Sequence, residues 1–150
     1  MPTKQRIKLI AQGGLVVDLP MIADVDLSAS GQYRFVTPAS TVGNVKLSTG
    51  GSNPTPLGVL QNAPVAGQPA RVRIFGISSM NASPGACNIV LGAFITSSST
   101  GTACLATCTG AGTALGRWLS ASTAADITNG TGCAFINCAA FGAACPGATT

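Results

Sequence analysis

The sequence contains no histidine and only four acidic residues, so the side chains that most enzymes use to move protons are nearly absent. General acid–base catalysis needs such groups close to the reacting atoms. A cysteine nucleophile also needs a base beside it, and no imidazole is present to fill that role. Neither a GxGxxG pattern nor a phosphate-binding P-loop pattern occurs. These absences predict a protein that is not an enzyme, with no catalytic residues and no cofactor.

Charge is scarce as well, since charged residues make up 8% of the chain, against roughly 25% in typical soluble domains. A surface built from Ser, Thr, Asn and Gly fits a chain that packs against neighbours, because charge is depleted at the centre of protein interfaces. The basic residues form no dense stripe with interleaved aromatic residues, so we expect no nucleic-acid partner. Three of them lie in the first eight positions, at Lys4, Arg6 and Lys8.

Long apolar runs are also missing. None approaches the roughly 20 residues that cross a bilayer, and the first residues lack the apolar core and cleavage site of a signal peptide. We therefore expect a protein that is made in the cytoplasm and has no membrane partner.

Short alternating runs dominate what is present. Nineteen glycines and nine prolines divide the chain, and no run keeps a 3.6-residue period. The clearest run covers residues 70–77, where Val72 and Ile74 alternate with Arg71 and Arg73, as in a strand with one buried face. Further strands are expected in residues 6–11, 13–20, 32–37, 44–48, 88–96, 113–119 and 133–138. The pattern predicts an all-β fold, with a single compact β-barrel or β-sandwich domain in residues 11–150 and residues 1–10 as a flexible N-terminal arm or first strand.

The cysteines lie in the second half of the chain, at Cys87, Cys104, Cys108, Cys133, Cys138 and Cys145. Without a secretion signal, a disulfide framework that the fold depends on is disfavoured, although disulfides formed after release stay open. The spacings lack paired C-x2-C motifs, and no histidine can complete a mixed zinc site, so a metal is disfavoured too. Thiols packed as small apolar residues are the favoured interpretation.

Asp24 and Asp26 alternate onto one face of an expected strand and could form a carboxylate pair or a weak calcium site. Oxygen-rich neighbours at calcium-loop spacing are missing, however. A solvated strand end is favoured, and we expect no metal site.

Residues 56–77, with the sequence PLGVLQNAPVAGQPARVRIFGI, resemble the phage capsid cement proteins, also called head decoration proteins. Members tend to carry a G-V-L-Q-N-x-P-x-x-G segment followed by an alternating strand that ends in V-x-[VI]-F-G. The matching positions are Gly58, Val59, Leu60, Gln61, Asn62, Pro64, Gly67, Val72, Ile74, Phe75 and Gly76. The run from Ala114 to Arg117 is similar to the family's V-G-R-A strand, so the resemblance extends over residues 56–127.

The resemblance implies a structural protein that assembles as a homotrimer on the outside of a phage head, binds the major capsid protein and stabilises the shell. It implies a location on the capsid surface of the virion after synthesis in the host cytoplasm. The basic residues we expect to contact the capsid or a neighbouring subunit are Lys4, Arg6, Lys8, Arg71 and Arg73. The last two could bind carboxylates of a neighbouring subunit in a bidentate manner, and a solvated sheet face fits either one alone equally well.

The alternative is a virion fibre or surface module that binds a host receptor or glycan. Such a module would need an exposed aromatic platform, for which Trp118 and Tyr33 are the candidates.

Overall fold

The computed structural model describes residues 15–50, 55–82, 89–106, 114–120 and 130–138. These residues form nine strands and no helix. The expected all-β fold is therefore confirmed, whereas the expected arm and the strand at residues 6–11 lie outside the described residues. The strands are β1 (Val17–Ala23), β2 (Phe35–Pro38), β3 (Asn44–Leu47), β4 (Gly58–Leu60), β5 (Pro69–Asn81), β6 (Phe94–Ser97), β7 (Ala103–Leu105), β8 (Gly116–Trp118) and β9 (Thr131–Asn137).

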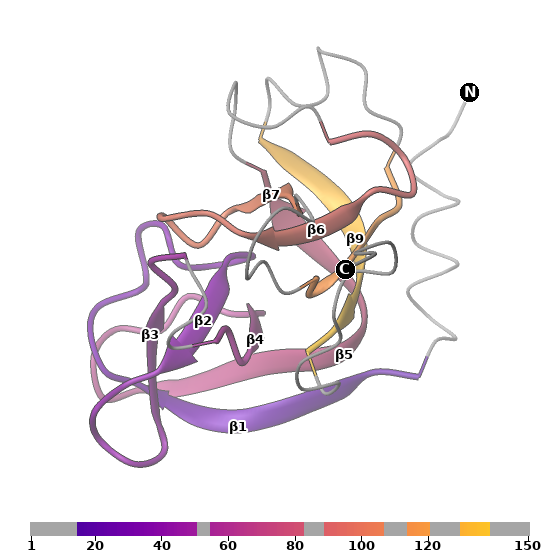
Figure 1. The fold of residues 1–150 in the computed structure, drawn as a ribbon. Coiled ribbons are helices and arrows are strands. Elements are labelled where there is room, and N and C mark those ends of the chain that lie inside the picture. Colours follow the sequence, from indigo (N-terminus) through magenta and orange to yellow (C-terminus); the bar gives the residue numbers. More distant parts are fainter. Residues whose placement is uncertain (1–14, 51–54, 83–88, 107–113, 121–129, 139–150) are drawn as a thin grey trace, which may run out of the picture.

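One continuous sheet contains the strands of the described residues, in the order β1-β3-β2-β4-β5-β9-β8-β6-β7. A further pairing between β1 and β5 closes the first five strands of this order into a barrel. The other four strands continue from β5 and form what we call the flanking sheet, which lies beside the barrel (Figure 1). The expected barrel is thus present, with four strands added to one of its edges.

Strand β5 belongs to both parts. Its first half pairs with β1 and β4, and its second half pairs with β9 from Phe75 to Asn81. Gly76 lies where the two halves meet, with a φ of 110° that other residues rarely adopt. A Cβ atom there would lie 2.7 Å from the carbonyl oxygen of Leu15. Only glycine fits at this bend, which directs β5 from the barrel into the flanking sheet.

Alternation along the barrel strands fills the inside of the barrel. Successive side chains of a strand point to opposite faces, so Val36, Leu60 and Val72 point inward and are fully buried. The barrel core consists of Ala23, Leu27, Val36, Val45, Leu60, Ala70 and Val72, with Met21, Leu47, Leu57 and Ile74 packed against it.

A second core lies between the outer wall of the barrel and the flanking sheet. Phe35 and Val59, which neighbour Val36 and Leu60 in sequence, point out of the barrel and are fully buried as well. They pack in one cluster with Met80, Ala82, Ile89, Ile95, Ala103, Leu115, Trp118, Ala134, Ile136 and Cys138. Strands β2 and β4 therefore contribute to both cores.

Several expected strands differ from the observed ones in their bounds. The run expected at residues 70–77 extends over Pro69–Asn81, and the run at residues 32–37 begins only at Phe35. Tyr33 has a φ of 61°, so it lies outside β2 and does not continue the face of Phe35 as the alternation suggested. The short strand β7 was not anticipated as a separate strand.

Candidate functional site

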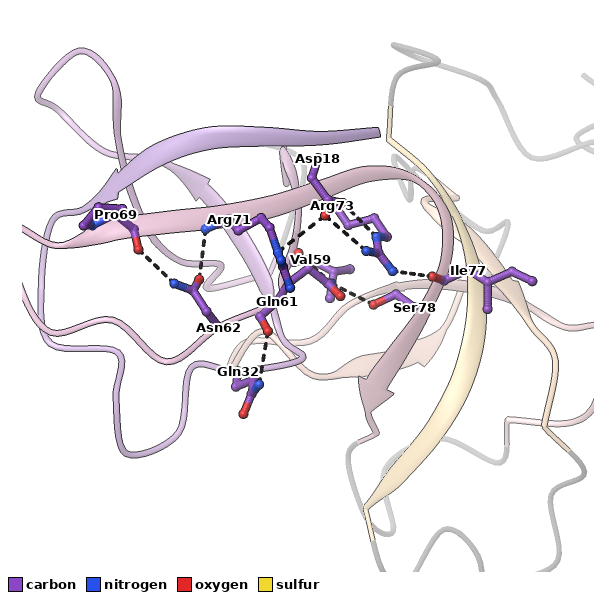
Figure 2. A network of polar contacts seen from close by, with 10 residues as sticks. All are labelled: Asp18, Gln32, Val59, Gln61, Asn62, Pro69, Arg71, Arg73, Ile77 and Ser78. Carbon is purple, nitrogen blue, oxygen red and sulfur yellow. Dashed lines mark hydrogen bonds and ion pairs between the residues drawn. The ribbon is translucent and has the colours of Figure 1, made fainter. Parts of the chain in front are cut away.

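Two arginines of β5 converge on one aspartate of β1 (Figure 2). The antiparallel pairing of the two strands places Asp18 opposite Arg73. Arg73 donates from Nε to Asp18 Oδ1 at 2.8 Å and from Nη2 to Asp18 Oδ2 at 3.1 Å, which is a bidentate ion pair. Its Nη1 donates to the carbonyl oxygen of Ile77 at 2.7 Å. The Arg73 side chain is only 17% exposed, so its guanidinium is committed to joining β1 to β5.

Arg71 is held much more loosely. Its Nε lies 3.5 Å from Asp18 Oδ2, and its side chain is 61% exposed. Exposed ion pairs of this kind contribute only about 0–1 kcal/mol to stability. Two guanidinium groups share one carboxylate here, so the three side chains together carry a net positive charge. Arg71 exposes this charge to solvent.

The structure therefore brings Arg71 and Arg73 together but gives them different roles. Carboxylates of a neighbouring subunit were one possible partner of both, and a solvated sheet face was the equal alternative for either one alone. The structure shows that Asp18 of the same chain is a partner of Arg73. Arg71 keeps an exposed guanidinium. The sequence offered one signal for Asp18, a lone charge within an apolar run, and no signal for its partner 55 residues away. Lys4, Arg6 and Lys8 lie outside the described residues.

Arg71 borders a surface hollow of about 460 Å³. Asn62 fixes the start of β5 beside this hollow, because its Nδ2 donates to the carbonyl oxygen of Pro69 and its Oδ1 accepts from the backbone N–H of Arg71, both at 2.9 Å (Figure 2). The lining residues are Asp18, Pro20, Asn62, Pro69, Ala70 and Arg71. The hollow thus combines two rigid proline rings with one exposed positive charge.

Other residues of the cement-like segment have roles in the fold itself. Gln61 is buried, and its Nε2 donates to the carbonyl oxygen of Val59 at 3.1 Å and to Ser78 Oγ at 2.8 Å. A Cβ atom at Gly58 would lie 2.4 Å from the carbonyl oxygen of Arg73, so β4 can approach β5 only with glycine there. These residues stabilise the framework around the hollow and do not themselves form a binding surface.

One end of the barrel exposes a group of β-branched apolar side chains, which we call the barrel-end patch. The segments that carry them are joined by backbone hydrogen bonds, from Ile22 to Gly43 and from Ala23 to Gln68. Ile22 also pairs with Pro69 of the hollow, so the patch and the hollow adjoin. The patch consists of Ile22, Val25, Val42 and Val65. Val42 is 99% exposed and makes no contribution to the core.

The two aspartates considered for a metal each have a local partner. Asp26 accepts from the backbone N–H and the hydroxyl of Ser28, and these hydrogen bonds lower the pKa of its carboxyl. Asp24 accepts from Asn44 Nδ2 at 3.0 Å. No group of three or more metal-binding side chains occurs in the part of the chain that the structure describes. The same part contains no helix that is long and apolar enough to cross a bilayer.

Among the thiols, Cys133 and Cys138 are free. Burial raises the pKa of Cys133, and it raises the pKa of Cys138 to about 12. A thiol that resists ionisation is a poor nucleophile, so Cys138 acts as a core residue. Cys87, Cys108 and Cys145 lie outside the described residues.

Trp118 cannot serve as an exposed aromatic platform. Its side chain is buried in the second core, and its ring lies on Gly132 of the neighbouring strand, where a Cβ atom would be 2.1 Å from a ring carbon. The expectation that Trp118 is a surface candidate is therefore wrong, because the glycine makes room for the ring across the sheet. Tyr33 remains partly exposed.

Comparison with known proteins gives one kind of match. No family model and no curated protein sequence matches the chain. Among solved structures, the chain is similar to the head fiber gp8.5 N base of bacteriophage phi29, with 16% sequence identity and a TM-score of 0.53. The match covers 82% of this chain and 95% of that one. The two proteins share a fold, and the resemblance to the cement family rests on residues 56–127 alone.

Proposed function

We propose that this chain is a structural protein of a phage virion that binds the outer surface of the assembled capsid and stabilises it. The observation that carries the proposal is the fold, which is similar over 82% of the chain to the base of a phage head fiber. The cement-like segment and the low content of charged residues agree with it, because both favour a protein that functions packed against neighbours.

The contact surface in this proposal is the barrel-end patch together with the Arg71 hollow. Exposed apolar patches with a polar rim mark protein contacts, and the patch adjoins the hollow through the pairing of Ile22 with Pro69. Arg71 adds specificity, since its guanidinium can bind a carboxylate of the capsid protein in a bidentate manner. Arg73 does not belong to this surface, because Asp18 already holds it.

The stabilising effect follows from assembly. One copy of so small a patch buries less than the roughly 1,200 Å² that durable interfaces need. A homotrimer presents three linked patches, and the second and third contacts then form at high effective concentration. A ligand that binds the assembled shell and not the separate subunits raises the stability of the shell by mass action.

A test compares binding to capsids with binding to monomeric capsid protein. Purified chain should add to capsids from which it has been stripped, leave the monomer unbound, and raise the temperature at which the capsids release their DNA. Equal binding to the monomer, or saturated capsids no more heat-resistant than bare ones, would contradict the proposal.

Two variants locate the contact. Arg71→Glu and Val42→Glu should each reduce uptake by roughly tenfold or more, since both side chains are exposed and neither supports the core. Matched controls lie in or just before the flanking sheet. Arg117→Glu reverses an exposed charge on β8, and Leu91→Glu alters an exposed residue in the turn before β6 that precedes a positive-φ glycine, as Val42 does. If the control variants reduce uptake as much as Arg71→Glu and Val42→Glu do, the contact lies elsewhere on the molecule.

A virion fibre or surface module that binds a host receptor or glycan is the second candidate, favoured by the similarity of the fold to the base of a head fiber. The number of copies per virion separates the two. A capsid decoration protein should be present in hundreds of copies per virion. A fibre that emerges from few positions should be present in far fewer copies.

A further inference from the structure

A second surface hollow, of about 280 Å³, shares no lining residue with the Arg71 hollow. It lies where the loop before β2 meets the end of β5, so that loop and the half of β5 that pairs with β9 both contribute to it. Its lining residues are Ser28, Ala29, Ser30, Gln32, Tyr33, Arg34 and Asn81. Nothing in the fold or in the proposed capsid contact uses these side chains together.

Tyr33 occupies an unusual backbone conformation in this hollow. Its φ of 61° is the only positive value among the described residues other than glycine, and left-handed conformations are rare for bulky side chains. The neighbouring strands enforce it, because Tyr33 N–H donates to the carbonyl oxygen of Leu60 and Tyr33 C=O accepts from Asn81 N–H, both at 2.8 Å. Strain that the surrounding structure enforces concentrates at ligand sites.

The polar side chains around Tyr33 are held in fixed positions. Gln32 Nε2 donates to the carbonyl oxygen of Gln61 at 3.1 Å, and Asn81 Nδ2 donates to the carbonyl oxygen of Gln32 at 3.0 Å. Arg34 Nη1 donates to the carbonyl oxygen of Thr100 at 3.2 Å. Arg34 Nε is buried and has no hydrogen-bond partner among the described residues, which is uncommon for a buried donor. The hollow is thus lined by polar side chains that hydrogen bonds within the chain already hold in place, so these side chains do not need to be ordered on binding.

The chemistry of the lining points to a hydroxylated ligand. Hydroxyls, amides, a phenol and a guanidinium supply both donors and acceptors, and Ala29 is the one aliphatic side chain among the lining residues. An extended peptide needs apolar pockets for its side chains, which this lining does not offer. The volume lies just below the roughly 300 Å³ at which pockets for drug-sized ligands begin. We propose that this hollow binds a single sugar ring of a glycan, a function that does not depend on the capsid contact.

The proposal can be tested by NMR titration of the ¹⁵N-labelled full chain with free glucose, galactose, N-acetylglucosamine and glucuronic acid at millimolar concentrations. At least one sugar should cause saturable shifts of the backbone amide signals of Gln32, Tyr33, Arg34 and Asn81. No shift with any of the four, or shifts spread over the whole molecule, would overturn the proposal. Saturable shifts of these same signals with a Ser-Gly-Asn-Ser-Gly peptide and with none of the sugars would also overturn it and assign the hollow to a protein partner.

The variant Tyr33→Gly separates binding from folding. Glycine adopts a positive φ readily, so the amide spectrum away from the hollow should be unchanged, while the affinity for the sugar falls by about tenfold or more. Arg34→Gln should weaken binding as well, and Val42→Glu, outside the hollow, should leave it unchanged. If both Tyr33→Gly and Arg34→Gln bind the sugar with full affinity, the proposal is overturned. Because sugar binding does not depend on the capsid contact, capsids should take up Tyr33→Gly as well as the unaltered chain.

Discussion

The barrel and the flanking sheet reach stability by different routes. The barrel closes on itself through the β1–β5 pairing and encloses a core built from its own strands. Among the described strands, the flanking sheet pairs with the barrel through β5, and it buries its apolar face against Phe35 and Val59 on the barrel's outer wall. The barrel thus holds a core of its own, whereas the core of the flanking sheet includes the barrel's outer wall.

The two parts also use their unusual residues differently. The barrel places a charged pair, Asp18 and Arg73, across the strands that close it. The flanking sheet is formed largely from strands of three or four residues and relies on close approach, with Gly132 under the ring of Trp118 and Gly116 against the carbonyl of Phe135. Gly58 has the same role in the barrel, where it lets β4 approach β5, so the bidentate ion pair is what distinguishes the barrel.

The largest effect is expected at the residue that links the two cores. Phe35→Ala should reduce the free energy of unfolding by about 3–5 kcal/mol, because it removes a fully buried ring. The same change should shift the emission of Trp118, the single tryptophan of the chain, to longer wavelength under native conditions, since both rings belong to the second core. Chemical unfolding followed by fluorescence measures both.

Val36→Ala is the matched control on the next residue, which points into the barrel. It should reduce the free energy of unfolding by about 2 kcal/mol and leave the emission of native Trp118 unchanged. Equal effects of the two changes on Trp118 would mean that the cores are not separate and would remove the contrast between the two parts.

A smaller loss is expected from Gly132→Ala, about 2–3 kcal/mol, because the added methyl group collides with the indole of Trp118. Gly43→Ala should cost only about 1 kcal/mol, since its Cβ atom meets nothing within 4 Å and only its φ of 85° is unfavourable. The double variant Gly132→Ala with Trp118→Phe should recover part of the loss, as a smaller ring relieves the collision. Thermal unfolding of the unaltered chain, of Gly132→Ala, Gly43→Ala and Trp118→Phe, and of the double variant measures these differences. Strict additivity of Gly132→Ala and Trp118→Phe would show that the collision is not the cause.

Between pH 9 and 10, the smallest effect concerns the thiol of the second core. Burial raises the pKa of Cys138 from 9.0 to about 12, so above pH 9 the unfolded chain loses this proton and the folded chain keeps it. The contribution of this thiol to the free energy of unfolding is fully present below pH 9. It falls as pH rises, by about 1.4 kcal/mol per pH unit, until the folded thiol ionises. Cys138→Ala should remove this part of the pH dependence. If the free energy of unfolding falls equally steeply with pH between pH 9 and 10 in the variant and in the unaltered chain, the thiol is accessible to water.

Part of this structure was predictable because its sequence alternates. The strand at residues 70–77 was recognisable from Val72 and Ile74 between Arg71 and Arg73, and the strand at residues 133–138 from its regular placement of apolar residues. Strand β4 is buried at all three positions and so shows no alternation, and β7 is three residues long. Neither gives a periodic signal of its own.

Other features depend on contacts that a sequence does not display. The closure of the barrel requires β1 to pair with β5, and the pairing of Asp18 with Arg73 follows from that register. The burial of Trp118 depends on which glycine lies beside it on the next strand. The same limit applies to Tyr33, whose conformation is imposed by Leu60 and Asn81. Each of these joins segments far apart in the chain.

The strand order has a consequence for synthesis on the ribosome. The barrel strands are complete once β5 has been made, but β8 and β6 pair into the sheet through β9, which is the last of the described strands in chain order. Until β9 is made, the second core around Phe35 and Val59 lacks Ala134, Ile136 and Cys138. A chain that stops before residue 131 thus leaves part of this core uncovered, and exposed apolar surface of that kind promotes aggregation of incomplete folds. Strand β9 therefore completes the second core.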